Sequence, residues 1–489
     1  MTEGVLPALI GTAQPARWPR VEVDAATWEE LGDLLAAGTL DLVSLWAEDG
    51  AVHAALREGA AAAILSVVAT GGRFPSLGRD HAPALRLERA IQDLTGLVAE
   101  GIPDLRPWLD HGRWAGGTGG VYEFLPVEGE GLHQIPVGPV HAGIIEPGHF
   151  RFTAHGETVV RLEQRLGYTH KGTAGLMRGA APLHAARLAG RVSGDATVAY
   201  AFAFALAAEQ AAGIEAPARA QWLRILMAEL ERLANHLGDI GAICNDAAFA
   251  VLFAHFGALR ERVLRASKEA FGHRLMMDAI VPGGVAHDIA PDGVAAVEAL
   301  LATLHRQLPR LVKTYDETNS LQDRTVGTGV VRAAWARRFA AGGYIGRAAG
   351  RDFDARRWGA YGGYDALTFD VPVLEAGDVN ARVWVRIREL EQSMALIAQA
   401  LQRLPALPWQ SPLPLPAREG EGAALVESFR GDVFLWLRLG ADGHVVACHF
   451  RYPSWFQWPL LEAAIENNIV ADFPLCNKSF NCAYSGHDG

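Results

Sequence analysis

The chain has 489 residues, more than one ordinary hydrophobic core holds, so two or more domains are expected. Half of the residues (50%) are hydrophobic and a fifth (20%) are charged, which is the balance of a globular protein. The formal net charge of -11, without a long basic run, argues against nucleic acid as a partner.

Cysteine usage and the N-terminus bear on the cellular compartment. The 4 cysteines are too few for a disulfide scaffold and fit a reducing environment. The first residues lack the basic and apolar regions of a signal peptide. The alanine-rich run 196–212 is apolar but ends at Glu209-Gln210, which favours a buried helix over a membrane span. Any membrane association is therefore expected through a partner.

Residues 1–112 are expected to form a small α+β domain. The spacing of apolar residues predicts its elements in this order: a strand at 21–23, a helix at 28–37, strands at 41–46 and 51–56, and a helix at 85–97. The stretch Gly112 to Gly120 is rich in glycine, as linkers are. We place the linker at 113–134, so that the second domain spans 135–489.

Two β-prone runs flank His155-Gly156 within residues 150–163, and this pattern predicts a hairpin. A hairpin brings its two flanks together, and the flanks carry titratable side chains: His141, Glu146 and His149 before it, and Tyr168, His170 and Lys171 after it. So many titratable groups on two adjacent loops suit proton-linked chemistry or the binding of a polar ligand. On spacing alone, the alternative that these are solvated loop residues remains open.

The middle of the chain predicts a bundle of long antiparallel helices. The expected helices are 183–212 with a break at 193–196, one from Pro217 onward, 256–276, 291–318 and 379–401. In the helix after Pro217, apolar residues recur every three or four positions and predict an inward-facing stripe: Trp222, Leu226, Leu230, Leu233 and Leu237.

Charged residues accompany these helices. Glu229, Arg232 and His236 share one helix face, either as a functional cluster or as a satisfied ion network, and spacing favours the network. The helix at 379–401 carries Arg382, Arg386 and Arg388. These arginines need a carboxylate, a phosphate or a partner surface unless their helix face is solvated.

The remaining segments complete an α+β fold class. Residues 319–380 are expected to be loop-rich, 432–438 and 444–451 to form a hairpin, and 458–468 to form a last helix. The chain is thus expected to have a small α+β N-terminal domain and a large, mainly α-helical domain. This second domain would begin with a β-hairpin-rich portion and end in a mixed region.

Several motifs in the same order carry a resemblance to a known family. They are Phe74-Pro-Ser-Leu-Gly-Arg-Asp, Leu87-Glu-Arg-Ala-Ile-Gln-Asp-Leu-Thr-Gly, Gly138-Pro-Val-His, Gly167-Tyr-Thr-His-Lys-Gly, Glu229-Leu-Glu-Arg-Leu-Ala-Asn-His, Pro282-Gly-Gly-Val and Gly377-Asp-Val-Asn-Ala-Arg-Val. Residues 74–109 resemble the small α+β (C-type, 30 kDa-type) component of respiratory complex I. Residues 135–489 resemble its quinone-site (D-type) component and, more closely, the large subunit of membrane-bound energy-converting nickel–iron hydrogenases. Fusion of the C-type and D-type parts is typical of the formate hydrogenlyase kind.

The resemblance implies metal ligands that this chain lacks. Hydrogenase large subunits hold nickel and iron with two Cys-x-x-Cys pairs, because such soft metal sites need thiolates. The matching positions here are Ser193, Ala196, Ala483 and Gly486, and Cys482 lies one residue from a ligand position. We therefore expect no nickel–iron centre and no other cofactor bound by this chain.

The resemblance to the D-type component implies a quinone site instead. In complex I a tyrosine and a histidine hold the quinone head, and an aspartate pairs with the histidine. Tyr168 matches the tyrosine and Asp246 matches the aspartate, whereas Ile145 or Glu146 stands where the histidine would be. Glu146 resembles the proton-relaying glutamate of the hydrogenases. The expected catalytic residues are Glu146, Tyr168, His170 and Asp246, and the expected quinone-binding residues are His141, His149, Tyr168 and Asp246.

The implied function is that of a large peripheral-arm component on the cytoplasmic side of the inner or plasma membrane. It would pass electrons from an iron–sulfur small subunit, similar to the B-type component of complex I, to quinone or another acceptor. Membrane partners similar to the H-type component of complex I and to antiporters would couple this transfer to ion translocation. No flavin or nicotinamide motif is present, so NAD binding is expected on another subunit, if at all.

Two other functions stay open. The chain is a catalytically silent coupling subunit if its old active site has lost all chemistry. It is a hydrogenase large subunit only if metal binds without the missing thiolates, which the replaced ligand positions disfavour.

Overall fold

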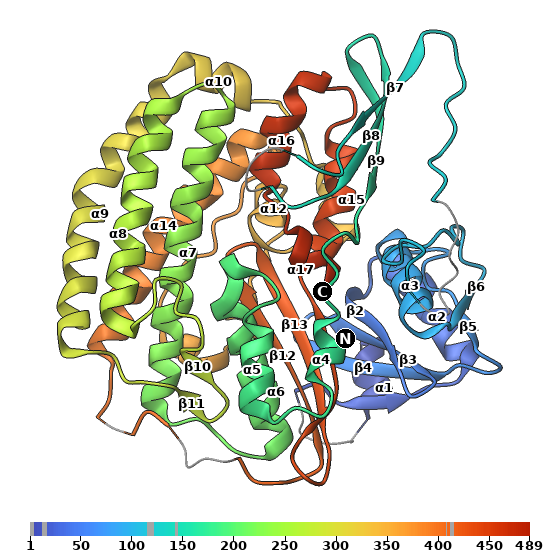
Figure 1. Cartoon of the computed structure of the whole chain (residues 1–489), viewed down its shortest axis with the longest axis horizontal. Helices are drawn as coiled ribbons and strands as arrows, with labels where there is room; N and C mark the ends of the chain where they lie inside the picture. Colours follow the sequence, from blue (N-terminus) through green and yellow to red (C-terminus); the bar gives the residue numbers. More distant parts are fainter. Residues whose placement is uncertain (1–3, 12–16, 115–121, 142–144, 407, 411–414) are drawn as a thin grey trace.

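The computed structural model describes residues 4–11, 17–114, 122–141, 145–406, 408–410 and 415–489. Figure 1 shows a smaller N-terminal part beside a larger part, in which long helices pack against a three-stranded sheet. This combination of a helix bundle and several small sheets confirms the α+β fold class. Within the described ranges, every helix is too short or too polar to serve as a membrane span.

The N-terminal part is built on a four-stranded sheet in the order β1-β4-β3-β2. Its strands are β1 (Arg20–Glu22), β2 (Asp41–Glu48), β3 (Ala51–Glu58) and β4 (Ala61–Val68), followed by the pair β5 (Arg73–Pro75) and β6 (Val98–Glu100). Its helices are α1 (Val5–Ile10), α2 (Ala25–Ala36) and α3 (Ala82–Thr95). Asp49 and Gly50 both have positive φ, which is the geometry of a tight two-residue hairpin turn, and this confirms the predicted strand pair.

Strand β4 was not predicted. Its sequence is a continuous run of alanines and larger apolar residues that does not alternate, so its periodicity does not separate a strand from a buried helix. In the structure it pairs with β3 on one side and with β1 on the other. Both neighbours are needed to identify it as a central strand.

A second sheet contains the predicted hairpin at His155-Gly156, which is confirmed. The strands are β7 (Leu132–Val137), β8 (His149–His155) and β9 (Thr158–Arg165), in the order β7-β8-β9. His149 pairs with Arg165, so the hairpin does bring its two flanks together. The sheet projects at the top of Figure 1, next to the C-terminal helices. Residues 142–144 of the preceding flank and 115–121 of the predicted linker lie outside the described residues.

The predicted bundle forms, except that the helix expected at 256–276 begins and ends more than one turn earlier, at 250–271. Its long helices are α7 (Ala218–Asp246), α8 (Ala250–Phe271), α9 (Pro291–Glu317) and α14 (Val379–Gln402), and α4 (Thr173–Met177), α5 (Pro182–Ala189) and α6 (Thr197–Ala212) precede them. Helix α7 packs against α8 and α14, and α8 packs against α9. The leucine stripe of α7 is buried, and Trp222 is partly buried at its edge.

Short helices replace the loops expected between α9 and α14. They are α10 (Asn319–Thr325), α11 (Ala333–Arg338), α12 (Gly343–Ala348) and α13 (Ala355–Gly359). The other small elements are the two-residue strands β10 (Ile280–Val281) and β11 (Gly284–Val285) and the 3-10 turns at Gly194–Ala196, Tyr361–Ala366 and Val470–Asp472. Helices of one or two turns carry too little periodicity to be predicted. Gly343 has positive φ, and a Cβ there would lie 2.0 Å from the carbonyl oxygen of Arg430. Only glycine lets α12 approach that backbone so closely.

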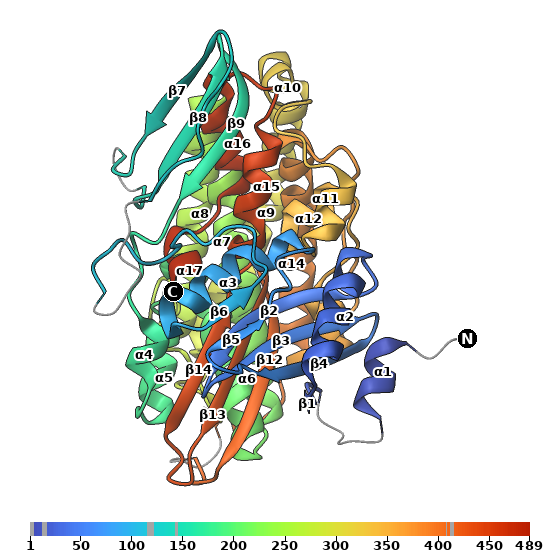
Figure 2. The same cartoon turned by 90° about the vertical axis from the view of Figure 1, so that its right-hand side faces the viewer.

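The C-terminal sheet joins the two parts of the molecule. Its strands are β12 (Gly420–Ser428), β13 (Gly431–Leu439) and β14 (Val445–Arg451), and α6 packs on β12 and β13. Strand β14 also contacts β2: the Ser44 hydroxyl lies 2.7 Å from Nε2 of His449, and the Trp46 ring stacks on His449 at 4.9 Å. Figure 2 shows the N-terminal sheet lying beside these strands. The predicted hairpin of β13 and β14 is confirmed, whereas β12 was not predicted.

The predicted last helix at 458–468 is misplaced. The helix is α15 (Ser454–Ala464), and α16 (Phe473–Phe480) and α17 (Tyr484–Asp488) follow it. Pro453 precedes the first turn and Pro459 lies inside the helix. Asn467 has a φ of 64°, which a helix cannot continue through. The helix boundaries therefore lie about one turn earlier than the apolar pattern indicated.

Candidate functional site

A polar cavity of about 410 Å³ opens where three distant segments meet. Ser193 comes from the turn before α6, Arg430 from the turn between β12 and β13, and Ala483 from the stretch between α16 and α17. Glu146, from the flank before β8, also lines the cavity. The volume falls in the range of small-molecule sites, which run from about 300 to 1,000 Å³. This cavity is the candidate site.

Arg430 connects the walls of the cavity. Its guanidinium donates to Oδ2 of Asp195 at 2.6 Å, to the Tyr452 hydroxyl at 3.1 Å and to the backbone carbonyl of Asn481. Asp195 in turn accepts from the Ser193 hydroxyl at 2.7 Å. Burial disfavours the charged carboxylate, but Arg430 outweighs it and lowers the pKa of Asp195. An ion pair thus fixes the 193–196 turn against the C-terminal segment.

Two polar groups of the cavity wall have unused hydrogen-bonding capacity. Lys478 makes no hydrogen bond or ion pair to any described residue, although its charge acts on Asp246. The hydroxyl of Tyr484 is buried beside the Asn477 side chain: burial raises the pKa of Tyr484 and Asn477 opposes that shift, but the contact falls outside good hydrogen-bonding geometry. Buried polar groups are normally hydrogen-bonded, so the Tyr484 hydroxyl, next to the half-buried Lys478, favours this cavity as a place for a polar ligand. Neither residue was singled out from the sequence.

Glu146 is positioned by the C-terminal segment. One of its carboxylate oxygens accepts from the backbone N–H of Ser485 at 3.1 Å, which leaves the other oxygen available to the cavity. Its charge also reaches Lys171: burial lowers the pKa of Lys171, and Glu146 opposes that shift. The hairpin flanks therefore meet around the C-terminal segment.

Two of the four positions expected to carry metal ligands line this cavity, and Gly486 lines a second cavity, which contains His170. Ser193 and Ala483 are the two that line the polar cavity, and Ala196 is buried next to the turn that carries Ser193. A Cβ added to Gly486 would lie 3.0 Å from Cβ of Ala483, so the two C-terminal positions are neighbours. The same added atom would lie 2.8 Å from the Tyr452 ring.

These residues do not fit a thiolate-bound metal. The ligand positions offer one hydroxyl, two methyl groups and a hydrogen, and soft metals need sulfur. The Cys482 thiol is buried, and burial raises its pKa, which opposes the thiolate. The Tyr452 ring, stacked on Tyr200 at 5.3 Å, occupies the space that a side chain at Gly486 would need. Among the described residues, no three His, Cys, Asp or Glu side chains are grouped to hold a metal ion.

Tyr168 and Asp246 do not line the cavity. The Tyr168 ring packs on His111, with 4.3 Å between ring centroids, and the side chain is 37% exposed. Asp246 is the last residue of α7; burial raises the pKa of its carboxyl, and Lys478 opposes that shift. The structure thus brings Asp246 within electrostatic reach of the cavity but leaves Tyr168 at the surface.

His170 belongs to a different cavity. Its Nδ1 lies 2.7 Å from the carbonyl oxygen of Asp488. The Asp488 carboxylate accepts from the backbone N–H groups of Gly167 and Thr169, both at 2.9 Å, which ties the loop after β9 to the end of the chain. His170 lines a second, more apolar cavity of about 330 Å³ between the N-terminal part and β14. Glu146 and His170, two of the four expected catalytic residues, therefore line different cavities.

The remaining predicted residues, His141 and His149, lie in the flank before β8 and at the start of that strand. Nδ1 of His149 lies 3.1 Å from the carbonyl oxygen of Gly138, and its ring packs on Phe124 at 4.9 Å. Both ring nitrogens of His141 are buried without a hydrogen-bond partner among the described residues. Neither histidine lines the 410 Å³ cavity. Only Glu146, of the predicted set, does so.

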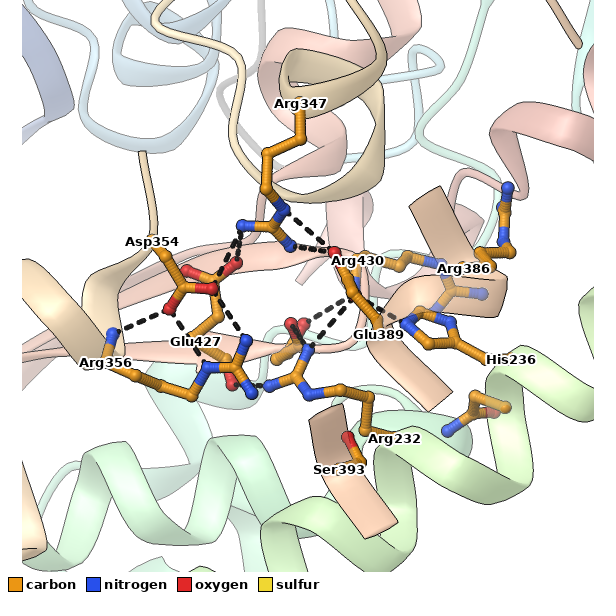
Figure 3. A network of polar contacts seen from close by, with 12 residues as sticks. Arg232, His236, Arg347, Asp354, Arg356, Arg386, Glu389, Ser393, Glu427 and Arg430 are labelled. Atoms are coloured by element: carbon orange, nitrogen blue, oxygen red, sulfur yellow. Dashed lines mark hydrogen bonds and ion pairs between the residues drawn. The ribbon is translucent and has the colours of Figure 1, made fainter. Parts of the chain in front are cut away.

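A buried charge network lies behind Arg430, and it includes the cluster expected on α7 (Figure 3). Arg232 donates to the carbonyl oxygens of Glu427 and Ser428, both at 2.9 Å, on the strand that leads to Arg430. Nε2 of His236 lies 2.6 Å from Glu389. The expectation of an ion network is confirmed for these fully buried residues, although Nδ1 of His236 has no hydrogen-bond partner among the described residues.

The arginines of α14 divide between buried and exposed positions. Arg382 and Arg386 are fully buried, and they reach the C-terminal segment: Arg382 donates to the Ser479 hydroxyl at 2.9 Å and Arg386 to the Ser479 carbonyl at 2.7 Å. Arg386 also pairs with Asp239 at 3.2 Å. Arg388 is exposed. The partners of two of these arginines are thus intramolecular.

Comparison with known proteins identifies relatives of this chain. Residues 246–418 match the family model described as respiratory-chain NADH dehydrogenase, 49 Kd subunit. Formate hydrogenlyase subunit 5 of Escherichia coli is 30% identical over 447 residues, which cover 87% of this chain and 78% of the relative. The carbon monoxide-induced hydrogenase of Rhodospirillum rubrum is 31% identical over 355 residues, covering 71% and 97%.

A third relative comes from the quinone-linked branch. A D-type component of the NADH-quinone oxidoreductase of Roseiflexus sp. is 31% identical over 352 residues, which cover 69% of this chain and 94% of the relative. Identity near 30% over most of both chains holds for hydrogenases and for the quinone oxidoreductase alike. The chain therefore belongs to the family that unites hydrogenase large subunits with the D-type components of NADH-quinone oxidoreductases.

Proposed function

We propose that this chain is the large peripheral subunit of a membrane-bound oxidoreductase complex related to complex I. Its relatives are named as components of NADH-quinone oxidoreductase, formate hydrogenlyase and hydrogenases. In the proposed complex an iron–sulfur subunit delivers electrons, the chain holds the electron acceptor, and membrane subunits couple the reaction to ion translocation.

One observation carries the proposal: Ser193 and Ala483, two of the four ligand positions of the hydrogenases, line a cavity that has no thiolate but has donors without a well-placed acceptor among the described residues. Lys478 and the Tyr484 hydroxyl supply these donors, and Glu146 supplies a carboxylate. We propose that the chain binds no nickel–iron centre and that the cavity takes a quinone head or a similar carbonyl acceptor.

The cavity supplies the groups that quinone reduction requires. Two electrons from the iron–sulfur partner and two protons convert a quinone to a quinol. Lys478 and Tyr484 donate hydrogen bonds to a carbonyl oxygen as negative charge develops on it. Glu146 takes up a proton from solvent and passes it to that oxygen from the carboxyl oxygen that faces the cavity, and the second proton comes from solvent through the open cavity.

The hairpin flanks supply a surface for the iron–sulfur partner. Val140 is 82% exposed and Leu176 is 61% exposed, and both are apolar side chains on segments that adjoin the hairpin. Ile145 is exposed as well and lines the cavity. Exposed apolar residues next to a functional cavity favour a docking surface. A partner placed here would bring its cluster next to the acceptor.

The test uses the complex purified from its native membrane. We expect stoichiometric iron–sulfur, no nickel, and quinone reductase activity that falls by about two orders of magnitude in Glu146→Gln, the low end for loss of general acid catalysis. Tyr484→Phe should raise the KM for quinone, whereas Tyr168→Phe, outside the cavity, should change neither parameter. Stoichiometric nickel or hydrogen evolution would refute the proposal.

A second candidate function is a silent coupling subunit, in which the cavity performs no redox chemistry. It is favoured by the position of Tyr168, which matches the quinone tyrosine of complex I but lies outside the cavity. The same assay separates the two candidates. An intact complex without quinone reductase activity, or one whose activity survives both Glu146→Gln and Tyr484→Phe, supports the silent subunit.

A further inference from the structure

The buried network in Figure 3 does not balance its charges. It joins three guanidinium groups to four carboxylates, through direct hydrogen bonds and ion pairs: Arg232, Arg347 and Arg356 with Glu229, Asp354, Glu389 and Glu427. Every one of these side chains is at most 1% exposed. With all of them ionised, the network carries one unpaired negative charge in a dry interior, which is strongly unfavourable.

The neighbouring charges do not offset this excess. Arg386 pairs with Asp239, Arg430 with Asp195 and Arg451 with Asp432, so each of these pairs is neutral by itself. Arg57 and Arg351 share Asp41, but Arg351 acts on Asp432 and neither of the two arginines is among the main charges that act on Glu427. Within the described part of the network, His236 remains as the only titratable group that could add a positive charge. Its Nε2 faces Glu389, but its Nδ1 is buried without a partner among the described residues. An imidazolium would leave that N–H unpaired, so His236 is neutral.

The carboxylates differ in the number of donors that they receive. Glu229 accepts from two arginines and also from the hydroxyls of Tyr364 and Ser393, both at 2.6 Å. Glu427 accepts from Arg347 at 2.9 Å and from the backbone N–H of Ala355 at 2.8 Å. Glu427 therefore has the weakest support for a negative charge.

The other two carboxylates are held more strongly than Glu427. Asp354 accepts hydrogen bonds from Nε and Nη2 of Arg356 and a third one from Arg347. Glu389 is contacted by two nitrogens of Arg347 and by His236. The excess proton of the network thus belongs on Glu427.

The direction of the pKa shifts agrees with this geometry. Burial and then Asp354 raise the pKa of Glu427 to about 7. Burial opposes ionisation of Glu229 as well, but Arg356 and Arg232 outweigh it and lower its pKa to about 2. The charged and titratable groups that face Glu427 come from α7, α12, α13, the 3-10 turn after it and β13: Arg232, Arg347, Asp354, Tyr361 and Asp432.

We propose that Glu427 is a proton-binding site that stays protonated in the resting protein, and that its charge is coupled to Arg430 in the cavity. Glu427 pairs with Asp432 across the hairpin, and Phe429 and Arg430 form the turn between them. Three residues of extended chain span at most about 11 Å, which bounds the distance between the α-carbons of Glu427 and Arg430. Arg232 holds the carbonyls of Glu427 and Ser428, which keeps this short path rigid.

Glu427 thus supplies a titratable proton behind the wall of the cavity. When negative charge enters the cavity, the proton on Glu427 becomes more tightly bound; when positive charge enters, the proton is released more easily. The protonation of Glu427 in the resting protein does not depend on the redox activity proposed above. It is therefore testable even if the cavity proves to be silent.

Infrared spectroscopy of the intact complex tests the proton directly. A protonated carboxyl has a carbonyl stretch that an ionised one lacks. We expect such a band at about pH 6 that disappears by about pH 9, because the group titrates near neutrality. The band should be lost in Glu427→Gln and shifted in Glu427→Asp.

The comparison variants are Glu88→Gln and Glu389→Gln. Glu88 is a buried carboxyl of the N-terminal part, and burial raises its pKa to about 7. The Glu88→Gln variant should therefore lose a different carboxyl band from the one that Glu427→Gln loses. Glu389 is ionised in the network and should lose no band. An unchanged carboxyl spectrum in Glu427→Gln, or a wild-type spectrum without this band at about pH 6, would show that Glu427 is ionised and overturn the proposal.

The coupling to the cavity has its own variants. Removing a nearby positive charge makes a carboxylate harder to form, so Arg430→Gln should raise the midpoint of the Glu427 band. Arg430→Lys keeps the charge and should leave the midpoint close to that of the wild type. Equal midpoints in both variants and in the wild type would exclude the coupling.

Discussion

The buried network and the cavity are neighbours with similar chemistry but opposite states of hydrogen bonding. In the network, Glu229 has two arginines and two hydroxyl donors around its carboxylate. In the cavity, Lys478 has no hydrogen-bond partner and Tyr484 has an unpaired hydroxyl, as far as the described residues show. The network is paired except for Nδ1 of His236 and one surplus carboxylate, so it contributes mainly to stability, whereas the donors of the cavity without a well-placed acceptor are available for binding.

The boundary between the two regions is a single turn. Arg430 sits on it, with the network behind and the cavity in front. Because a half-satisfied buried network is costly, the fold tolerates unpaired groups only where a ligand or solvent reaches them. The difference predicts that substitutions behind Arg430 act on stability and that substitutions in front of it act on function.

The largest effect is expected from breaking the network at Arg356. Arg356→Ala leaves Glu229 and Asp354 without a guanidinium that each one contacts at 3.0 Å or less. Removing one partner of a buried ion pair costs about 3–5 kcal/mol, which chemical denaturation would measure. The matched control is Arg357→Ala, whose side chain is 49% exposed beside Asp352 and should cost less than about 1 kcal/mol. Equal losses in the two variants would contradict the comparison.

Glu427→Gln should change how stability depends on pH. The folded pKa of Glu427, about 7, lies above that of an unfolded chain, so the wild type loses stability as pH rises from about 4 to about 7. The variant lacks this titration, so its free energy of unfolding relative to that of the wild type should rise by up to about 3 kcal/mol across that range. Unfolding at a series of pH values measures it, and the exposed Glu317→Gln should run parallel to the wild type.

Gly486→Ala tests whether the old ligand position has closed. The added Cβ meets the Tyr452 ring at 2.8 Å and Ala483 at 3.0 Å. Overpacking of this kind costs about 1–3 kcal/mol, because a packed ring has to move. Ala483→Ser, which faces the cavity, has room and should cost less. A stable Gly486→Ala with an unmoved melting temperature would mean that the site still accepts a side chain.

The smallest effect separates two tyrosine hydroxyls. Tyr484→Phe removes a hydroxyl with no described partner and should change stability by less than about 0.5 kcal/mol. Tyr364→Phe removes a donor to Glu229 at 2.6 Å and should cost about 1.5–3 kcal/mol, since that bond is charge-assisted. Thermal unfolding of both variants makes the comparison. A larger loss of stability in Tyr484→Phe than in Tyr364→Phe would mean that the Tyr484 hydroxyl is the better hydrogen-bonded of the two.

Local pattern was enough for elements with strong periodicity. The leucine stripe of α7 and the hairpin at His155-Gly156 both follow from residue spacing, and both are confirmed. Where periodicity is weak, prediction failed: β4 is a continuous apolar run, and α15 begins one turn earlier than its pattern. Their limits depend on pairing and on backbone angles that neighbouring segments impose.

The candidate site was predictable only in part. Glu146 and the four replaced ligand positions follow from motif spacing, and Glu146, Ser193 and Ala483 do line one cavity. Tyr168 follows from the same reasoning but packs on His111 at the surface. Motif spacing does not state which way a loop turns a side chain.

The sequence by itself determined the family, the long helices and the loss of the sulfur ligands, because these depend on residue identity and on short-range spacing. The tertiary structure alone decided that Tyr484 and Lys478 join Glu146 in one cavity and that Glu427 lies in an unbalanced charge network. Contacts such as Arg356 with Glu229 join segments more than a hundred residues apart. Such pairings are set by the packing of whole helices and strands, which no local pattern encodes.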